Sequence, residues 1–168
     1  MHAIRRRIQG FTLIELLIVI AVIAILAAIA FVALDPLRRF QDTRDARRLA
    51  DTTSLLNAVK VDQVDRGGSY LTSIANMNAG EVYMVGTAVA GCDDANAQCD
   101  TDVTDDNNCV DLAGLVTAGK LGSVPVSPNG AGTWTAATSG YTLSRAATGI
   151  ITVRACESEN TGEISVSR

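Results

Sequence analysis

An uninterrupted apolar run near the N-terminus constrains this chain more than any other feature. Residues 16–34, LLIVIAVIAILAAIAFVAL, contain no charged or strongly polar side chain. At a helical rise of about 1.5 Å per residue, this run spans about 28 Å, close to the hydrocarbon thickness of a bilayer. We therefore expect one membrane-spanning helix over residues 11–34. The chain has 168 residues in all, which leaves room for one further small domain.

The segments that flank this run carry most of the basic residues. Residues 1–10, MHAIRRRIQG, form a short leader with Arg5, Arg6 and Arg7. Five more arginines follow the span within a short distance, and they partly cancel the bias that the leader creates. They are Arg38, Arg39, Arg44, Arg47 and Arg48. The charge pattern alone therefore does not decide which end of the helix faces the cytoplasm.

Composition argues against two large classes of function. The chain has 14 basic and 18 acidic residues, and 11 basic residues remain once Arg5, Arg6 and Arg7 are set aside. This acidic balance disfavours a nucleic-acid binder that follows phosphates with a basic face. The single histidine is His2, so chemistry that needs an imidazole has no candidate beyond the leader. We predict a protein that is not an enzyme and has no specific nucleic-acid partner.

Glu15 is the residue that a simple anchor does not explain. A carboxylate in hydrocarbon costs a few kcal/mol unless it is paired. No lysine, arginine or histidine lies between residues 8 and 37, so the partner must come from elsewhere. A cut after Gly10 would create an amino group on Phe11 at nearly the same membrane depth. In a helical stack of identical subunits, Glu15 of one chain could then meet the Phe11 amine of the next.

Two other interpretations of the N-terminus stay open at this point. A secretory signal peptide could be cut after Ala30, because residues 28–30 offer a small-residue cleavage site. That cut would release a binding domain from the membrane. A plain uncleaved anchor that tethers such a domain needs nothing except the apolar run. Neither interpretation accounts for Glu15.

The residues around Glu15 resemble a known motif. The string GFTLIELL over residues 10–17, with arginines just upstream, is similar to the processing and assembly motif of type IV pilins and of type II secretion pseudopilins. The resemblance is close over residues 5–34 and slight over the globular part. It implies that a prepilin peptidase cuts after Gly10 and methylates the new amino group of Phe11. It also implies that Glu15 guides subunit assembly.

The resemblance further implies a function, partners and a location. The chain would be a structural subunit of a type IV pilus-like filament or, alternatively, a type II secretion pseudopilin. Its partners would be other copies of itself in a helical filament, the prepilin peptidase, the pilus or secretion assembly machinery, and the membrane. It would cross the cytoplasmic membrane once with the C-terminal domain outside. It would then enter an extracellular or periplasmic filament.

Beyond the span, residues 35–66 predict an amphipathic continuation of the helix. Asp35 and Pro36 suit a helix start, whereas Gly67 and Gly68 suit its end. Residues 11–34 contain no glycine or proline, so we expect a kink at Asp35 and Pro36. One side, predicted to cover the globular domain, carries Leu49, Leu55, Leu56 and Val59. The opposite side, which either faces a neighbouring subunit or belongs to one broad core stripe, carries Ala46, Ala50, Val61 and Val64.

Residues 67–168 predict a small extracytoplasmic domain. Apolar alternation and turn residues indicate a short strand over residues 81–85, a short helix over 110–118, and strands over 132–136, 140–145 and 150–155. The expected fold class is therefore α+β and pilin-like. In this fold the long N-terminal helix packs against a small antiparallel sheet of three or four strands.

Four cysteines, Cys92, Cys99, Cys109 and Cys156, form no C-x-x-C motif. In an exported domain of this size we expect two disulfides. Three connectivities are open, and we favour Cys92 with Cys99 and Cys109 with Cys156. A four-cysteine zinc site is the less favoured alternative.

The cysteine-rich region is also acidic, with seven aspartates between residues 93 and 111. Carboxylates at this density repel one another unless solvent or a cation intervenes. The run DTDVTDDN offers oxygen ligands of the kind that calcium prefers, although it lacks the glycine and the terminal glutamate of an EF-hand loop. We favour a solvated loop without a metal. Calcium is the secondary hypothesis, with Asp100, Asp102, Asp105 and Asp106 as candidate ligands.

Overall fold

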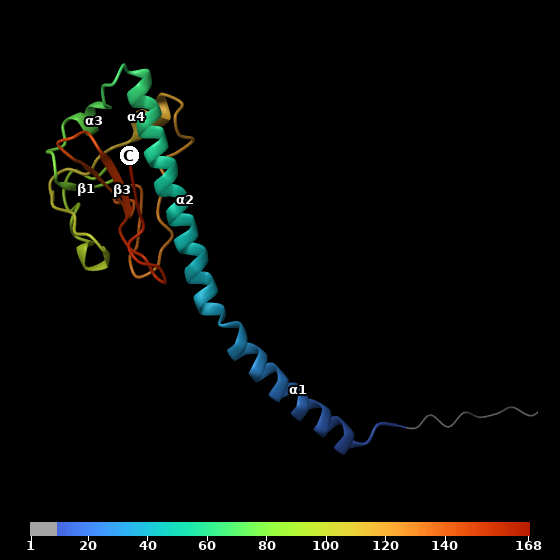
Figure 1. Cartoon of the computed structure of the whole chain (residues 1–168). Helices are drawn as coiled ribbons and strands as arrows, with labels where there is room; N and C mark the ends of the chain where they lie inside the picture. Colours follow the sequence, from blue (N-terminus) through green and yellow to red (C-terminus); the bar gives the residue numbers. More distant parts are fainter. Residues whose placement is uncertain (1–9) are drawn as a thin grey trace, which may run out of the picture. The chain divides into compact units, whose positions relative to one another are not determined.

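The computed structural model describes residues 10–168, which form two compact units (Figure 1). One unit runs up to Arg39 and the other from Phe40 to Arg168. Arg5, Arg6 and Arg7 of the expected leader lie outside the described residues.

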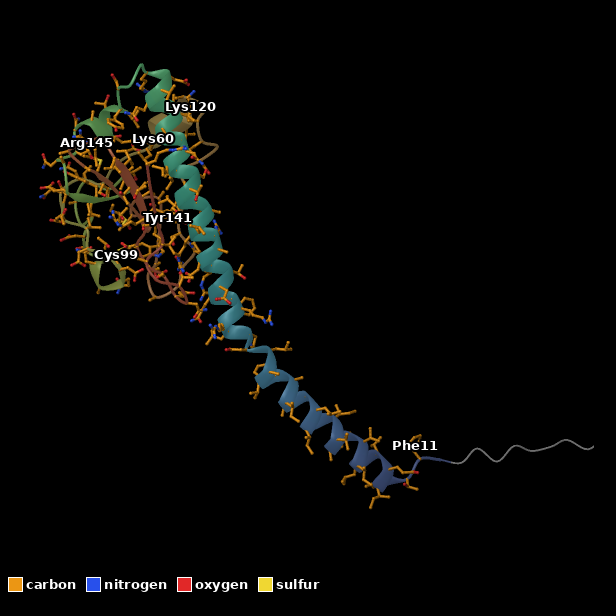
Figure 2. The ribbon with its side chains drawn as sticks, in the orientation of Figure 1. Phe11, Lys60, Cys99, Lys120, Tyr141 and Arg145 are labelled. Carbon is orange, nitrogen blue, oxygen red and sulfur yellow. A yellow bond between two sulfur atoms is a disulfide. The ribbon has the colours of Figure 1, made fainter. Side chains whose placement is uncertain are left out.

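The first unit contains helix α1 (Leu13–Leu34), in which every residue except Glu15 is apolar. None of its residues is buried against the protein, and its side chains project outward on all sides (Figure 2). Its 22 residues correspond to about 33 Å at the usual helical rise. Among the described residues, this is the start of the one helical stretch long and apolar enough to cross a membrane.

The predicted break at Asp35 and Pro36 is confirmed. Helix α1 ends at Leu34, and α2 (Pro36–Asp65) begins after Asp35, whose φ is 36°. Proline disfavours the α-helical region for the residue before it, and a short polar residue such as aspartate tolerates the left-handed region. The Asp35 carboxylate also accepts a hydrogen bond from the Arg38 N–H at 3.5 Å, as an N-cap does.

Helix α2 turns one side toward the core of the second unit. Leu55, Leu56 and Val59 are buried there, as expected. The prediction for Leu49 is wrong, because its side chain is 50% exposed. At that level of the helix, polar side chains occupy the side turned toward the domain, namely Asp45, Arg48 and Thr52. Helix α2 ends at Asp65, just ahead of the predicted stop at Gly67 and Gly68.

The sheet has four strands in the order β1-β2-β3-β4, and all neighbouring strands are antiparallel. They are β1 (Val82–Met84), β2 (Tyr141–Arg145), β3 (Ile151–Ala155) and β4 (Ser165–Ser167). Leu143 pairs with Tyr83 on one side and with Val153 on the other. These residues join the α2 side chains in one core, so the predicted α+β arrangement is confirmed.

Tyr141 connects the sheet to α2 (Figure 2). Its ring is buried, and its hydroxyl donates to the Asp51 carboxylate at 2.7 Å. Burial, together with this hydrogen bond and the charge of Asp51, raises the pKa of the Tyr141 phenol. The phenol therefore stays protonated and acts as a fixed hydrogen-bond donor to the helix.

Three details of the domain differ from prediction. Residues 132–136 form no strand, because Trp134 N–H donates to the Asn129 side chain and Gly132 N–H donates to Glu157. The helix expected over residues 110–118 is only α4 (Ala113–Thr117), since Val110 instead forms a bridge with Val85. Three elements were not anticipated: α3 (Thr72–Ala75), β4 and a short 3₁₀ helix, η1 (Asn96–Gln98).

Candidate functional site

The residues that the sequence singled out lie at the start of α1. Gly10, Phe11 and Thr12 belong to no regular element, and the helix begins at Leu13. The Phe11 side chain is 83% exposed, and it is labelled in Figure 2. The peptide bond between Gly10 and Phe11 is therefore outside the helix and open to a protein that approaches it.

Gly10 is not crowded by any of residues 11–168. A Cβ atom at this position would meet nothing within 4 Å. Crowding by the described residues therefore does not demand glycine here. Recognition by another protein is a physical reason that remains for a small residue at this position.

Thr12 and Glu15 form a capping box at the first turn of α1. The Thr12 hydroxyl accepts from the Glu15 N–H at 3.3 Å, and Glu15 Oε2 accepts from the Thr12 N–H at 2.9 Å. The Thr12 hydroxyl also donates to Oε2 at 2.7 Å. Our sequence reasoning missed this role for Glu15, although a threonine followed three residues later by glutamate is the usual signature of such a cap.

The cap satisfies hydrogen bonds of Glu15, but among residues 10–168 no cation pairs with its carboxylate. Thr12 supplies only neutral donors, and the N-terminal end of the helix dipole adds a modest favourable field. Glu15 is the single charged residue of α1. Within α1 itself, no cation is available to neutralise it.

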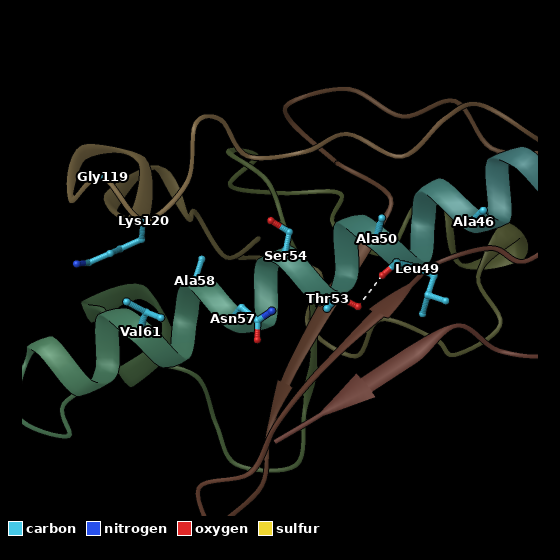
Figure 3. A pocket seen from close by; sticks show the side chains of 10 residues that line it. All are labelled: Ala46, Leu49, Ala50, Thr53, Ser54, Asn57, Ala58, Val61, Gly119 and Lys120. Atoms are coloured by element: carbon cyan, nitrogen blue, oxygen red, sulfur yellow. Dashed lines mark hydrogen bonds between the residues drawn. The ribbon is translucent and has the colours of Figure 1, made fainter.

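An open groove of about 860 Å³ runs along the exposed side of α2 (Figure 3). Small side chains form most of its floor, and the half-exposed Leu49 and Val61 supply its apolar contacts. Gly119 and Lys120, which follow α4, line one side of it. Of the residues predicted for the outer side of this helix, three line the groove, namely Ala46, Ala50 and Val61. Helix α2 thus has apolar residues on a second side that its own domain leaves exposed.

The four cysteines form two disulfides, but not in the favoured pairing. Cys92 is bonded to Cys109, with 5.6 Å between their Cα atoms, and Cys99 to Cys156, with 4.2 Å. The prediction was wrong because Cys99 N–H donates to the Asn96 carbonyl in a short 3₁₀ turn (Asn96–Gln98). This turn carries Cys99 to the end of β3, where Cys156 lies, and leaves Cys92 to Cys109.

The calcium candidates do not converge on one point. Asp100 accepts from the Ser158 hydroxyl, Asp105 from the N–H groups of residues 107 and 108, and Asp106 from the Gly91 N–H. Within residues 10–168, no three acidic, histidine or cysteine side chains are placed to hold a metal ion.

Asp93 is instead held close to a second carboxylate. A hydrogen bond with Asp106, burial, and the charges of Asp106 and Asp94 raise the pKa of Asp93. Crowding of these carboxylates therefore favours the protonated form of Asp93.

The comparisons with known proteins bear on the N-terminal site alone. Residues 5–31 match the family described as prokaryotic N-terminal methylation motif, which is the signature of type IV pilins and pseudopilins. The matched residues contain Gly10, Phe11, Thr12 and Glu15. No curated protein and no solved structure matches the chain.

Proposed function

We propose that this chain, which carries the N-terminal signature of type IV pilins and pseudopilins, is a structural subunit of a type IV pilus-like filament. A prepilin peptidase hydrolyses the peptide bond between Gly10 and Phe11 and methylates the new amino group of Phe11. The mature chain then leaves the membrane and packs through α1 into a helical filament. The chain itself presents the bond to be cut, anchors itself in the membrane through α1 and packs against other subunits.

The observation that carries the proposal is the position of the scissile bond. Gly10 and Phe11 are exposed and non-helical, and the capping box starts the helix two residues later. A peptidase needs an extended strand of substrate, which a helix does not offer. The cap at Thr12 therefore separates the segment to be cut from the segment to be kept.

The anchor role rests on the surface of α1. In the membrane, lipid tails already cover its apolar side chains, so helix association there depends on close packing and polar contacts. Outside the membrane the same side chains would face water, at about 25 cal/mol for each Å² exposed. Extraction is thus favourable only if other copies of α1 cover this surface at once. A filament core does so.

Glu15 supplies the register of this packing. The cleaved chain has a positive amino group on Phe11 and a carboxylate on Glu15, four residues apart. When one subunit lies beside the next, the Glu15 carboxylate can leave its Thr12 cap and pair with the neighbouring ammonium. In an apolar environment either charge alone would be costly, and pairing compensates both charges. The groove on α2 offers a second surface for neighbouring subunits.

A type II secretion pseudopilin is the alternative within the same architecture, and the same residues would do the same work. A tethered or released binding domain is the alternative of another class. The position and methylation of the mature N-terminus distinguish a filament subunit or pseudopilin from a binding domain. The machinery that polymerises the chain then distinguishes a pilus subunit from a pseudopilin.

The test is the mass of the N-terminal peptide after coexpression of the full chain with a prepilin peptidase. A methylated Phe11 supports the proposal. An N-terminus at Phe31 would show release by a signal peptidase, and an intact Met1 would show a plain anchor, and either result would contradict it. Substitution of Gly10 by alanine should block cleavage without changing the fold, since a Cβ there meets nothing within 4 Å. Coexpression with pilus or with secretion components then shows which machinery assembles the subunit.

A further inference from the structure

A fully buried arginine joins α2 to the rest of the domain. Arg48 is 0% exposed, and its guanidinium donates to Asp45 at 2.8 Å and to Glu157 at 2.5 Å. It also donates to the Pro128 carbonyl at 3.0 Å and to the Ser127 hydroxyl at 3.2 Å. We refer to Asp45, Arg48 and Glu157 as the Arg48 cluster. A buried charge is tolerated only when such partners are held in place.

The cluster holds the segment that follows β3, residues 156–161, against the helix. Asp45 accepts hydrogen bonds from the backbone N–H groups of residues 159, 160 and 161. Arg44 forms an ion pair with Glu159 at 2.8 Å. Glu157 also accepts from the N–H groups of Ala131 and Gly132 and from the indole of Trp134. One turn of α2 thus organises two loops that are far away in the sequence.

The same segment is tied to the acidic loop from its other side. Cys156, its first residue, is bonded to Cys99 and directly precedes Glu157. The Asp100 N–H donates to the Cys156 carbonyl at 2.5 Å, and the Ser158 hydroxyl donates to the Asp100 carboxylate at 2.7 Å. The disulfide therefore lies one residue from the carboxylate that holds Arg48. Cys156 is buried and Cys99 is half-buried, so Cys99 is the more accessible residue of this disulfide.

We propose that the Cys99–Cys156 disulfide is a redox latch that sets whether residues 156–161 are docked on α2. In the closing reaction the two thiols lose two electrons and two protons to an external disulfide, which becomes two thiols while the new S–S bond forms. An external dithiol reverses the step. In the reduced chain Glu157 is free to move away from Arg48, and the segment loosens. This inference goes beyond the filament role and does not depend on it.

The latch has a reciprocal consequence. If the disulfide favours the closed Arg48 cluster, the closed cluster must equally protect the disulfide, because the two equilibria are linked. The chain would then complete the contacts between α2 and its C-terminal segment only in an oxidising compartment, where disulfides persist. The hydrogen bonds of Cys92 and Cys109 go to Asp106 and Ala88 and not to Glu157 or α2, so the Cys92–Cys109 disulfide serves as the matched control for cleavage of the segment.

The first test uses the full chain in detergent micelles and a glutamate-specific protease. Replacing Cys99 and Cys156 together by serine should speed cleavage after Glu157 and Glu159 by about tenfold or more, as expected for easier local opening. Cleavage after Glu81, beside β1, should change little. The emission of Trp134, the only tryptophan of the chain, should shift as its indole loses Glu157. The pair Cys92→Ser and Cys109→Ser should leave cleavage after Glu157 and Glu159 near that of the parent chain, whereas Trp134 shares a buried cluster with Cys92 and is not compared in this variant.

The second test leaves all cysteines in place. Asp45→Asn weakens the cluster, so a dithiol should reduce Cys99–Cys156 several-fold faster, as read by alkylation and peptide mass. Asp51→Asn, which disturbs the Tyr141 contact on the same helix, should not change that rate. Equal acceleration of cleavage after Glu81, or an unchanged reduction rate in Asp45→Asn, would show that the disulfide is only a general staple and would overturn the latch.

Discussion

The hydroxyl of Thr12 lies 2.7 Å from the carboxylate of Glu15, which also receives the Thr12 N–H. The carboxylate that the assembly proposal assigns to a neighbouring subunit is therefore already in use within its own chain. It caps the helix before assembly and would change partners during it. This exchange makes the first turn of α1 a place where small substitutions have separable effects.

Thr12→Ala should loosen the first turn of α1. It removes the hydroxyl that accepts the Glu15 N–H, and loss of such a cap costs about 1 kcal/mol. Hydrogen exchange of the amides at residues 13–16, measured on the full chain in micelles, should become about fivefold faster. Thr12→Ser keeps a hydroxyl and should behave like the parent. Equal exchange rates in all three proteins would show that the cap is not formed in solution.

Arg48→Met should destabilise the globular domain strongly. Asp45 and Glu157 stay buried but lose their cation, and breaking a buried pair in this way costs about 3–5 kcal/mol. The measurement is the urea midpoint followed by Trp134 emission. Arg47→Met is the matched control at the preceding residue. The Arg47 side chain is 63% exposed, and its ion pair with Asp51 is long, at 3.7 Å. We therefore expect this variant to lose less than about 0.5 kcal/mol of stability. Similar losses in the two variants would contradict the cluster.

Asp45 should make the domain sensitive to acid. Burial raises the pKa of Asp45, but hydrogen bonds from the backbone N–H groups of Asn160 and Glu159 and from Arg48 outweigh burial and bring the pKa below its ordinary value. A lowered folded-state pKa contributes stability above the ordinary pKa of about 4, and this contribution is lost as the pH falls through the folded value.

The corresponding measurement is the urea midpoint between neutral pH and about pH 2. Asp45→Asn should start less stable and lose less stability on acidification than the parent. Asp102→Asn changes an exposed carboxylate and should reproduce the parent profile. A parent-like slope in Asp45→Asn would mean that Asp45 is not the group responsible.

Calcium should leave the thermal stability unchanged. The carboxylates of Asp100, Asp105 and Asp106 each accept a different local hydrogen bond and share no common centre. A cation at a hundred times its Kd would add about 2.7 kcal/mol, which a melting curve detects easily. We expect the Tm with excess calcium and with a chelator to agree within about 1 °C. A clear rise with calcium would restore the metal site.

The fold was predictable where local signals and burial agree. The charge-free run defines α1, the pair Asp35 and Pro36 defines the break, and Gly67 with Gly68 follows the end of α2. Alternation of apolar residues located β2 and β3. The short strand β4 has only one apolar residue, Val166, and it exists because β3 offers it a partner. A sequence pattern cannot show this.

The contacts made at long range were the least predictable. Nothing in the sequence near Arg48 indicates that Glu157, 109 residues away, will bury it. Leu49 was misassigned for the same reason, because charged neighbours took the inward side of the helix. The disulfide pairing depended on a 3₁₀ turn before Cys99 that composition does not reveal. By contrast, the N-terminal site is formed by residues close together in the sequence, and the spacing from Thr12 to Glu15 already predicts its capping box.

The most direct test of the account replaces Glu15 by glutamine in the full chain and measures cleavage and assembly together. The account predicts normal removal of the leader, because the exposed bond after Gly10 is unchanged, and a loss of sheared filaments of about tenfold or more, because each Phe11 amine is left without its carboxylate. Glu15→Asp keeps the charge and should retain part of the assembly. Normal filament yield from correctly processed Glu15→Gln chains would contradict the account.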